Sequence, residues 1–298
     1  IDLSLVTRSV SPILVRSGES VRFQLTVVNE GKAISGKYEV VVTGPVPWSR
    51  TYISLGAGES NDIEYTLPSL SPGRHAFEAY VNLDGDEDPL NNTVGWSAAA
   101  GALPQQVLIN EVMAAPDDGG PEWVELVNPS GQEVEVSGWR MTDSRGGEGA
   151  KVEADIVSLP SGFYLVLTKD LSQFHLHNPT LRSVEVVSAS GWPTLNDGGD
   201  QVVLQDATGE VIDRMSYGST VLGRSIERID VFGSSDDLEN WHPNTSETGS
   251  TPGEENSVAK HPTEDGVELQ ESPNPFKDRV EISYVLPSVT ATVNLWVF

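Results

Sequence analysis

The 298-residue chain contains no cysteine, which excludes disulfide bonds, thiolate zinc sites and cysteine nucleophiles. It has no apolar run long enough to cross a bilayer, and no signal peptide opens it. The opening "IDLSLVTRSVSP" already reads as a strand followed by a turn. We therefore expect a mature or excised fragment, in which a missing signal is no argument for a cytoplasmic location.

Basic residues are also scarce, since 18 Lys and Arg stand against 44 Asp and Glu and give a net charge of −26. Such a surface repels nucleic-acid phosphates and anionic lipids, and no local basic patch compensates for it. We expect a monomer with no nucleic-acid partner and no membrane insertion. The sequence also lacks G-x-S-x-G, H-E-x-x-H, P-loop and dinucleotide-binding motifs, so it predicts no catalytic residues and no enzyme activity.

What the sequence does contain is a succession of short alternating or β-branched runs, separated by Gly, Pro, Asn and Asp clusters. In "SVRFQLTVVNEG", apolar Val21, Phe23, Leu25 and Val27 alternate with polar residues, which predicts a strand with one buried face. Strands at intervals of roughly ten to twenty residues are typical of sandwiches. The predicted fold class is all-β, with tandem immunoglobulin-like β-sandwiches.

Two segments resemble known families. Residues 1–98 carry "DLSLVTRSVSP", "GESVRFQLTVVNEGKA", "LSPGRHAFEAYVNLDG" and "DEDPLNNT", and this order resembles the immunoglobulin-like CARDB adhesion domain. Residues 107–256 carry "INEV", "WVELVN", "VSGWRMTD", "LPSGFYLVL", "DGGDQVVLQDATGEVID" and "STPGEEN", which resembles the lamin tail domain. That resemblance implies an immunoglobulin-like fold, which is also found in bacterial secreted proteins.

The remaining segments are predicted as connections and a partial third domain. Residues 99–106, within "SAAAGALPQQ", read as a flexible linker, and the polar, acidic residues 257–271 read as a second one. Residues 272–298 carry "SPNPF", "ISYVLP" and "VNLWVF", which resembles the start of a FlgD-like C-terminal sorting or secretion domain.

The glutamates of "PEWVELVN" and "QEVEVSGW" raise the question of an active site. On a strand, Glu122 and Glu125 point to opposite faces, so they do not form an acid/base pair. Glu133 and Glu135 alternate with valines, as on the exposed face of a sheet over a core. These carboxylates predict a sheet wall rather than an active site.

Glu111 and Glu125 are the exception, because they lie on two regular strands that would bring like charges together if they paired. One hypothesis is a calcium or other metal site. The alternative is that each carboxylate takes an arginine or backbone amide partner, with Arg140 and Arg224 as candidates.

The other candidate ligand groups are acidic turns. In "NLDGDEDPLNN", Asp84, Asp86 and Asp88 occupy alternate positions around a glycine, which suits the oxygen ligands of calcium, although the spacing is not that of an EF-hand. Acidic hairpin tips are also common simply because they are exposed. Residues 115–122 and 195–200 are weaker candidates, since Asp-Gly-Gly is first a turn signal.

Aromatic and histidine side chains have mainly structural interpretations. Trp123, Trp139 and Trp241 are expected to cover the core of the second domain, with a sugar-binding platform as the alternative. His175 and His177 would share a face if extended, but no further metal ligands are evident.

The function that fits these features is a non-catalytic array at the bacterial cell surface or in secreted form, acting in adhesion, spacing or presentation. Its partners would be neighbouring domains of the parent protein or an extracellular surface. Two alternatives stay open. The chain could be the accessory region of a larger secreted hydrolase, such as a nuclease, or a module that binds carbohydrate or protein.

Overall fold

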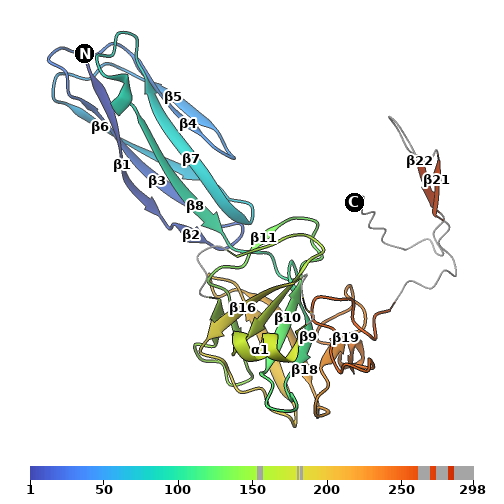
Figure 1. Ribbon diagram of the computed structural model, residues 1–298. Coiled ribbons are helices and arrows are strands. Elements are labelled where there is room, and N and C mark those ends of the chain that lie inside the picture. Colours follow the sequence, from blue (N-terminus) through green and yellow to red (C-terminus); the bar gives the residue numbers. More distant parts are fainter. Residues whose placement is uncertain (153–156, 180, 182–183, 261–268, 273–280, 285–298) are drawn as a thin grey trace.

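The computed structural model describes residues 1–152, 157–179, 181, 184–260, 269–272 and 281–284 (Figure 1). Two β-rich domains follow one another, and Figure 1 shows strand β8 leading from the first into the second. The predicted all-β class is confirmed, because strands dominate both domains and the longest helix has seven residues.

The first domain is a sandwich of a three-stranded sheet (β1-β3-β6) and a five-stranded sheet (β2-β8-β7-β4-β5). All pairs are antiparallel except β2 with β8. Its elements are β1 (Leu3–Ser11), β2 (Leu14–Val15), β3 (Val21–Asn29), β4 (Tyr38–Thr43), β5 (Trp48–Tyr52), β6 (Ser60–Leu67), β7 (Gly73–Asn82), a 3-10 turn (Pro89–Asn91) and β8 (Thr93–Ala100).

The alternation predicted for the third strand places its apolar side chains in this core. Val21, Phe23, Leu25 and Val27 are all buried. Thr26 is an exception on the polar face: it is buried too, and its hydroxyl donates a 2.6 Å hydrogen bond to Asp62 on the neighbouring strand. The period of two therefore fixes the inward face.

The second domain wraps one mixed sheet of ten strands, in the order β18-β17-β12-β13-β16-β15-β10-β9-β19-β20, around its own core. The pair β15–β16 is parallel, and β11–β14 forms a separate two-stranded sheet. The elements are β9 (Leu108–Met113), β10 (Trp123–Val127), β11 (Val134–Glu135), β12 (Arg140–Thr142), β13 (Ala150–Val152), β14 (Ser158–Leu159), β15 (Tyr164–Thr168), α1 (Leu171–His177), β16 (Glu185–Ser190), β17 (Asp200–Gln205), β18 (Val211–Tyr217), β19 (Ile226–Arg228), a 3-10 turn (Leu238–Asn240) and β20 (Trp241–Pro243).

This sheet has two apolar faces. Val124 and Leu126 of β10 point into the main core, whereas Trp123 points outward into a smaller cluster with Met113, Val166 and Phe174 of α1. The prediction that Trp123, Trp139 and Trp241 cover the core is confirmed, because all three are buried.

One local prediction was wrong, and one condition was not met. The linker does not begin at residue 99, because β8 continues through Ala100 and its last residue pairs with Gly73 of β7. His175 and His177 do not lie on an extended segment, because Asp170 caps the helix α1 with its carboxylate. The strand extends to Ala100 because its alanines pair with β7. The helix begins after Asp170 because that carboxylate accepts from the otherwise unpaired Gln173 amide.

The partial sorting-type domain predicted for 272–298 lies almost entirely outside the described residues. Within them, β21 (Leu269–Ser272) pairs antiparallel with β22 (Glu281–Tyr284).

Candidate functional site

Three buried glutamates stand side by side across the sheet of the second domain. Glu125 of β10 lies opposite Glu111 of β9, and Glu111 lies opposite Glu227 of β19. All three side chains belong to residues that are 0% exposed. We call these three residues the carboxylate row. The strands of Glu111 and Glu125 do pair, which was the condition for these two like charges to meet, whereas Glu227 is an addition that the sequence did not reveal.

A single segment, residues 244–257, covers this row and supplies most of its donors; we call it the closing segment. The Thr251 amide donates to Glu111 at 2.9 Å and the Gly253 amide donates to Glu125 at 2.5 Å. Glu227 accepts from the side chains of Asn244, Thr251 and Ser257.

Two donors come from the sheet itself. Asn110 Nδ2 donates to Glu125 at 2.9 Å, and Ser225 Oγ donates to Glu111 at 2.5 Å. Burial raises the pKa of Glu111 to about 8, and burial together with the neighbouring Glu111 raises the pKa of Glu125 well above its ordinary value.

The predicted partners of these glutamates were half right. Backbone amides do reach both, but the two candidate arginines do not. Arg140 donates to the Glu148 carbonyl, and Arg224 donates to the carbonyls of Asn244 and Ser246. Their guanidinium groups satisfy loop carbonyls instead, because the loops bring those oxygens within reach.

A buried ion pair that the sequence analysis missed lies beside the row. Arg228 is completely buried, and its Nη2 lies 3.0 Å from Asp213 Oδ2. The same guanidinium stacks over Trp241 with 4.6 Å to the ring centroid. Burial raises the pKa of Asp213 although Arg228 acts in the opposite direction, so desolvation is the larger effect here.

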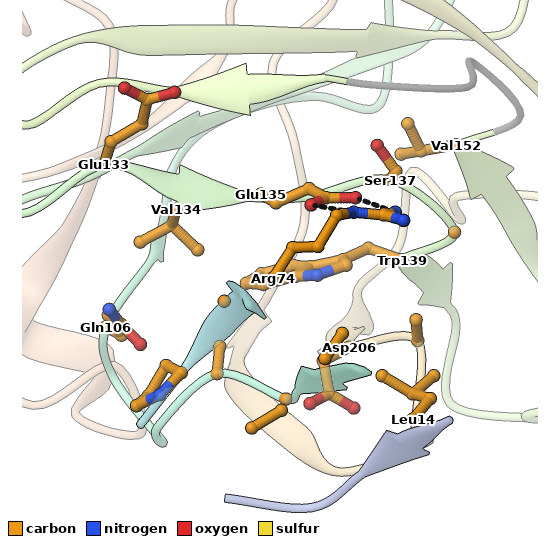
Figure 2. A pocket seen from close by; sticks show the side chains of 18 of the residues that line it. Leu14, Arg74, Gln106, Glu133, Val134, Glu135, Ser137, Trp139, Val152 and Asp206 are labelled. Carbon is orange, nitrogen blue, oxygen red and sulfur yellow. Dashed lines mark hydrogen bonds and ion pairs between the residues drawn. The ribbon is translucent and has the colours of Figure 1, made fainter. Parts of the chain in front are cut away.

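A second candidate site is a cavity of about 660 Å³ between the two domains (Figure 2). The first domain contributes Leu14 and Arg74, and the second contributes Glu135, Trp139 and Asp206. Figure 2 shows Arg74 and Glu135 facing each other across the junction, joined by paired hydrogen bonds of 3.0 and 3.3 Å.

Asp206 occupies an unusual position at this junction. Its Oδ1 accepts from the amides of Thr208 and Glu210, which fixes the carboxylate in the turn between β17 and β18. Its Oδ2 is buried and finds no hydrogen-bond partner among the described residues. That oxygen lies against Gly101, where an added Cβ would come within 2.2 Å of it.

The predicted calcium loop is partly committed to backbone contacts. Asp86 accepts from the amides of Leu3 and Asp88, while Asp84 and Asp88 are exposed. A hollow of about 430 Å³ beside this loop is lined by Asp84, Asp86 and Asn92. The buried Oδ1 of Asn92 has no hydrogen-bond partner among the described residues. The loop thus has free oxygens next to engaged ones.

Within the described part of the chain, no group of three or more His, Asp or Glu side chains is arranged to hold a metal ion. The calcium prediction for Asp84, Asp86 and Asp88 and the metal hypothesis for Glu111 and Glu125 stay predictions. No helix among the described residues has the length and apolar character to span a membrane.

Comparisons with known proteins follow the division into two domains. Residues 101–219 match the family described as the Lamin Tail Domain. No curated protein matches the chain.

Solved structures to which the chain is similar include the CARDB domain of a Pyrococcus furiosus protein, with 17% identity over 34% of this chain and 94% of that one, at a TM-score of 0.30. A domain of a candidate cell surface protein from Methanosarcina acetivorans has 18% identity over 34% and 93%, at 0.28. The sporulation control protein Spo0M of Bacillus subtilis has 11% identity over 71% and 83%, at 0.27. Residues 101–219 are similar to the lamin tail domain family, and a β-sandwich precedes them.

Proposed function

We propose that the chain is a non-catalytic β-sandwich array that acts outside the bacterial cell, secreted or at the surface, where it spaces or presents neighbouring parts of its parent protein. The observation that carries this proposal is the docked junction between two domains with separate cores. Each domain has its own core, so a junction with several contacts sets how they are held relative to each other.

The junction combines backbone and side-chain contacts. The amides of Ala99 and Gly101, at the end of β8, donate to the carbonyls of Ile13 and Val15. Beyond the linker, the Gln105 amide donates to the Ile212 carbonyl of the second domain at 2.7 Å. Few residues between these anchors are therefore free to bend.

Two ion pairs bridge the domains as well. Arg74 pairs with Glu135, and Arg16 lies 3.5 Å from Glu210. Each pair is partly exposed, and such pairs contribute only about 0–1 kcal/mol singly. Their value for a spacer is orientation: together with the Asp206–Gly101 contact, they hold the domains at points on both sides of the cavity.

Distance measurement between spin labels tests whether the junction is stiff. The cysteine-free chain accepts single labels at exposed positions, for which we choose Thr51→Cys on β5 and Ser172→Cys on α1. We expect one narrow distance distribution. Glu135→Gln should broaden it, whereas Glu133→Gln, an exposed residue just before β11 that forms no ion pair among the described residues, should leave it unchanged. A broad distribution in the doubly labelled chain without a further substitution would contradict a spacer of fixed geometry.

Location is tested separately, on cells that make the parent protein. External protease and antibody should reach the domains in intact cells if the proposal holds, and protection from both would overturn it. The reading frame of the parent protein decides the main alternative, because a hydrolase domain next to this region would make it an accessory part.

A further inference from the structure

The carboxylate row is unusual because it places three like charges next to each other away from water. Residues directly opposite on neighbouring strands have Cβ atoms about 4.5–5.5 Å apart. Like charges at this separation repel strongly in a buried environment, and each ionised carboxylate also loses its hydration. Hydrogen-bond donors or protons must therefore stabilise Glu125, Glu111 and Glu227.

The hydrogen bonds that the row accepts from the described residues come from neutral groups: backbone amides, hydroxyls and side-chain amides. None of the ion pairs formed by the described residues includes one of the three glutamates. Neutral hydrogen-bond donors therefore stabilise the row, and no cationic side chain of the described residues forms an ion pair with it.

The charged and titratable groups around the row do not supply that neutralisation. Burial raises the pKa of Tyr164 on β15, and the carboxylates of Glu125 and of Glu255 in the closing segment raise it further. Of the two nearby arginines, Arg224 donates to carbonyls of the closing segment and Arg228 pairs with Asp213. Among the described residues no cationic side chain is left to lower the charge of the row, and a bound proton would lower it.

We propose that the folded protein keeps at least one proton on the carboxylate row at neutral pH, and that loss of this proton at alkaline pH releases the closing segment from the sheet. The segment responds because its own groups form the hydrogen bonds. Thr251, Gly253, Asn244 and Ser257 all donate into the row, so mutual repulsion of the carboxylates acts on the surface that this segment covers.

The direction of the pH effect follows from the pKa values. The unfolded glutamates release their protons near their ordinary pKa of 4.5, whereas burial raises the pKa of folded Glu111 to about 8. Between these values the folded state binds more protons than the unfolded state. The stabilisation is therefore complete below about pH 4.5 and is lost as pH rises through about 8.

Hydrogen exchange of the full chain tests the proposal at the amides of Thr251 and Gly253, after correction for the intrinsic pH dependence of exchange. We expect the opening constant of the closing segment to rise by up to about tenfold per pH unit between the exposed and the buried pKa of the row, and to level off above about pH 8. High salt should be used, because it screens the general repulsion of a chain with net charge −26. An opening constant that does not change with pH overturns the proposal.

The isosteric variant Glu111→Gln separates a shared proton from a structural need for carboxylate. It should remove the rise of the opening constant with pH, and at pH 9 it should hold the closing segment more tightly than the unsubstituted chain does. Glu133→Gln, an exposed glutamate of the same domain, should retain the rise. If Glu111→Gln loosens the segment equally at every pH, all three carboxylates are ionised and the proposal is wrong.

A measurement on the unaltered chain covers the case in which the variant does not fold. Urea midpoints at pH 5.5, 7 and 8.5 should fall in that order, since over most of this window the folded state holds a proton that the unfolded state has already released. Midpoints that stay level or rise would overturn the proposal without any substitution.

Discussion

Arg228 shows, at the scale of single residues, how the second domain satisfies a buried charge. Its Nε donates to the Ile109 carbonyl at 2.8 Å, and its Nη2 donates both to Asp213 and to Ser235. A guanidinium can serve several acceptors in one plane, which an ammonium group does not. The surrounding chain is therefore built to accept an arginine at this position.

Removing this guanidinium is expected to destabilise the protein strongly. Arg228→Met leaves Asp213 buried without its cation, which typically costs about 3–5 kcal/mol. The double variant with Asp213→Asn should cost less than the sum of the single variants, because the two side chains interact directly. Urea denaturation measures all three. Strictly additive losses would contradict a coupled pair.

Asp86 links the acidic loop to the first strand. Asp86→Ala removes the acceptor of the Leu3 and Asp88 amides, and we expect a loss of about 1–3 kcal/mol in thermal unfolding. Melting in calcium and in chelator separates this effect from a metal site. A calcium-dependent rise in the melting temperature of the unsubstituted chain that disappears in Asp86→Ala would support the predicted site. Identical melting temperatures in calcium and in chelator would contradict that site.

At the scale of strands and turns, a feature could be predicted when the residues that determine it lie close together in the sequence. The inward faces of β3 and of the segment around Glu133 and Glu135 were predicted, because alternation is read within a few residues. Glu227 was not, because β19 has only three residues and its register comes from pairing with β9, more than a hundred positions earlier. The motif "STPGEEN" of the closing segment was identified in the sequence, but its position over Glu111 and Glu125 was not predicted.

The turn between β12 and β13 offers a test of backbone geometry. Gly146 and Gly149 both adopt positive φ angles, of 70° and 65°. A Cβ at Gly149 would lie 2.4 Å from the Met141 carbonyl oxygen, whereas nothing lies within 4 Å of one at Gly146. We expect Gly146→Ala to cost about 1–2 kcal/mol from conformation alone. Gly149→Ala should cost about 1–3 kcal/mol more, because the clash is with backbone. Urea denaturation that shows equal losses would contradict this steric reading.

At the scale of the whole molecule, one small residue lies at the point where the two domains meet. Gly101 follows β8 directly and lies against Asp206 Oδ2. That carboxylate does not move away easily, because its other oxygen accepts from the amides of Thr208 and Glu210. The sequence showed a small-residue linker here, but composition alone did not reveal that one glycine forms a contact.

Gly101→Ala is therefore expected to separate the domains without unfolding either. Small-angle scattering should show a larger radius of gyration, while the unfolding transitions of both cores persist. Gly95→Ala on β8 is the matched control, since the nearest neighbour of its added Cβ would be the Phe77 carbonyl at an ordinary 3.7 Å. Identical scattering curves for the two variants would show that Gly101 does not determine docking.

The path of the chain through the first domain has a mechanical consequence. Strand β1 begins near Ile1 at the end of the sandwich remote from the second domain, and β8 leaves toward that domain (Figure 1). Tension applied along this path would load β1 against β3 and β8 against β7 lengthwise. Hydrogen bonds between antiparallel strands lie across the strands, so such a pull would shear many of them together. A sandwich stretched in this direction resists force far better than one whose strands are peeled apart one bond at a time.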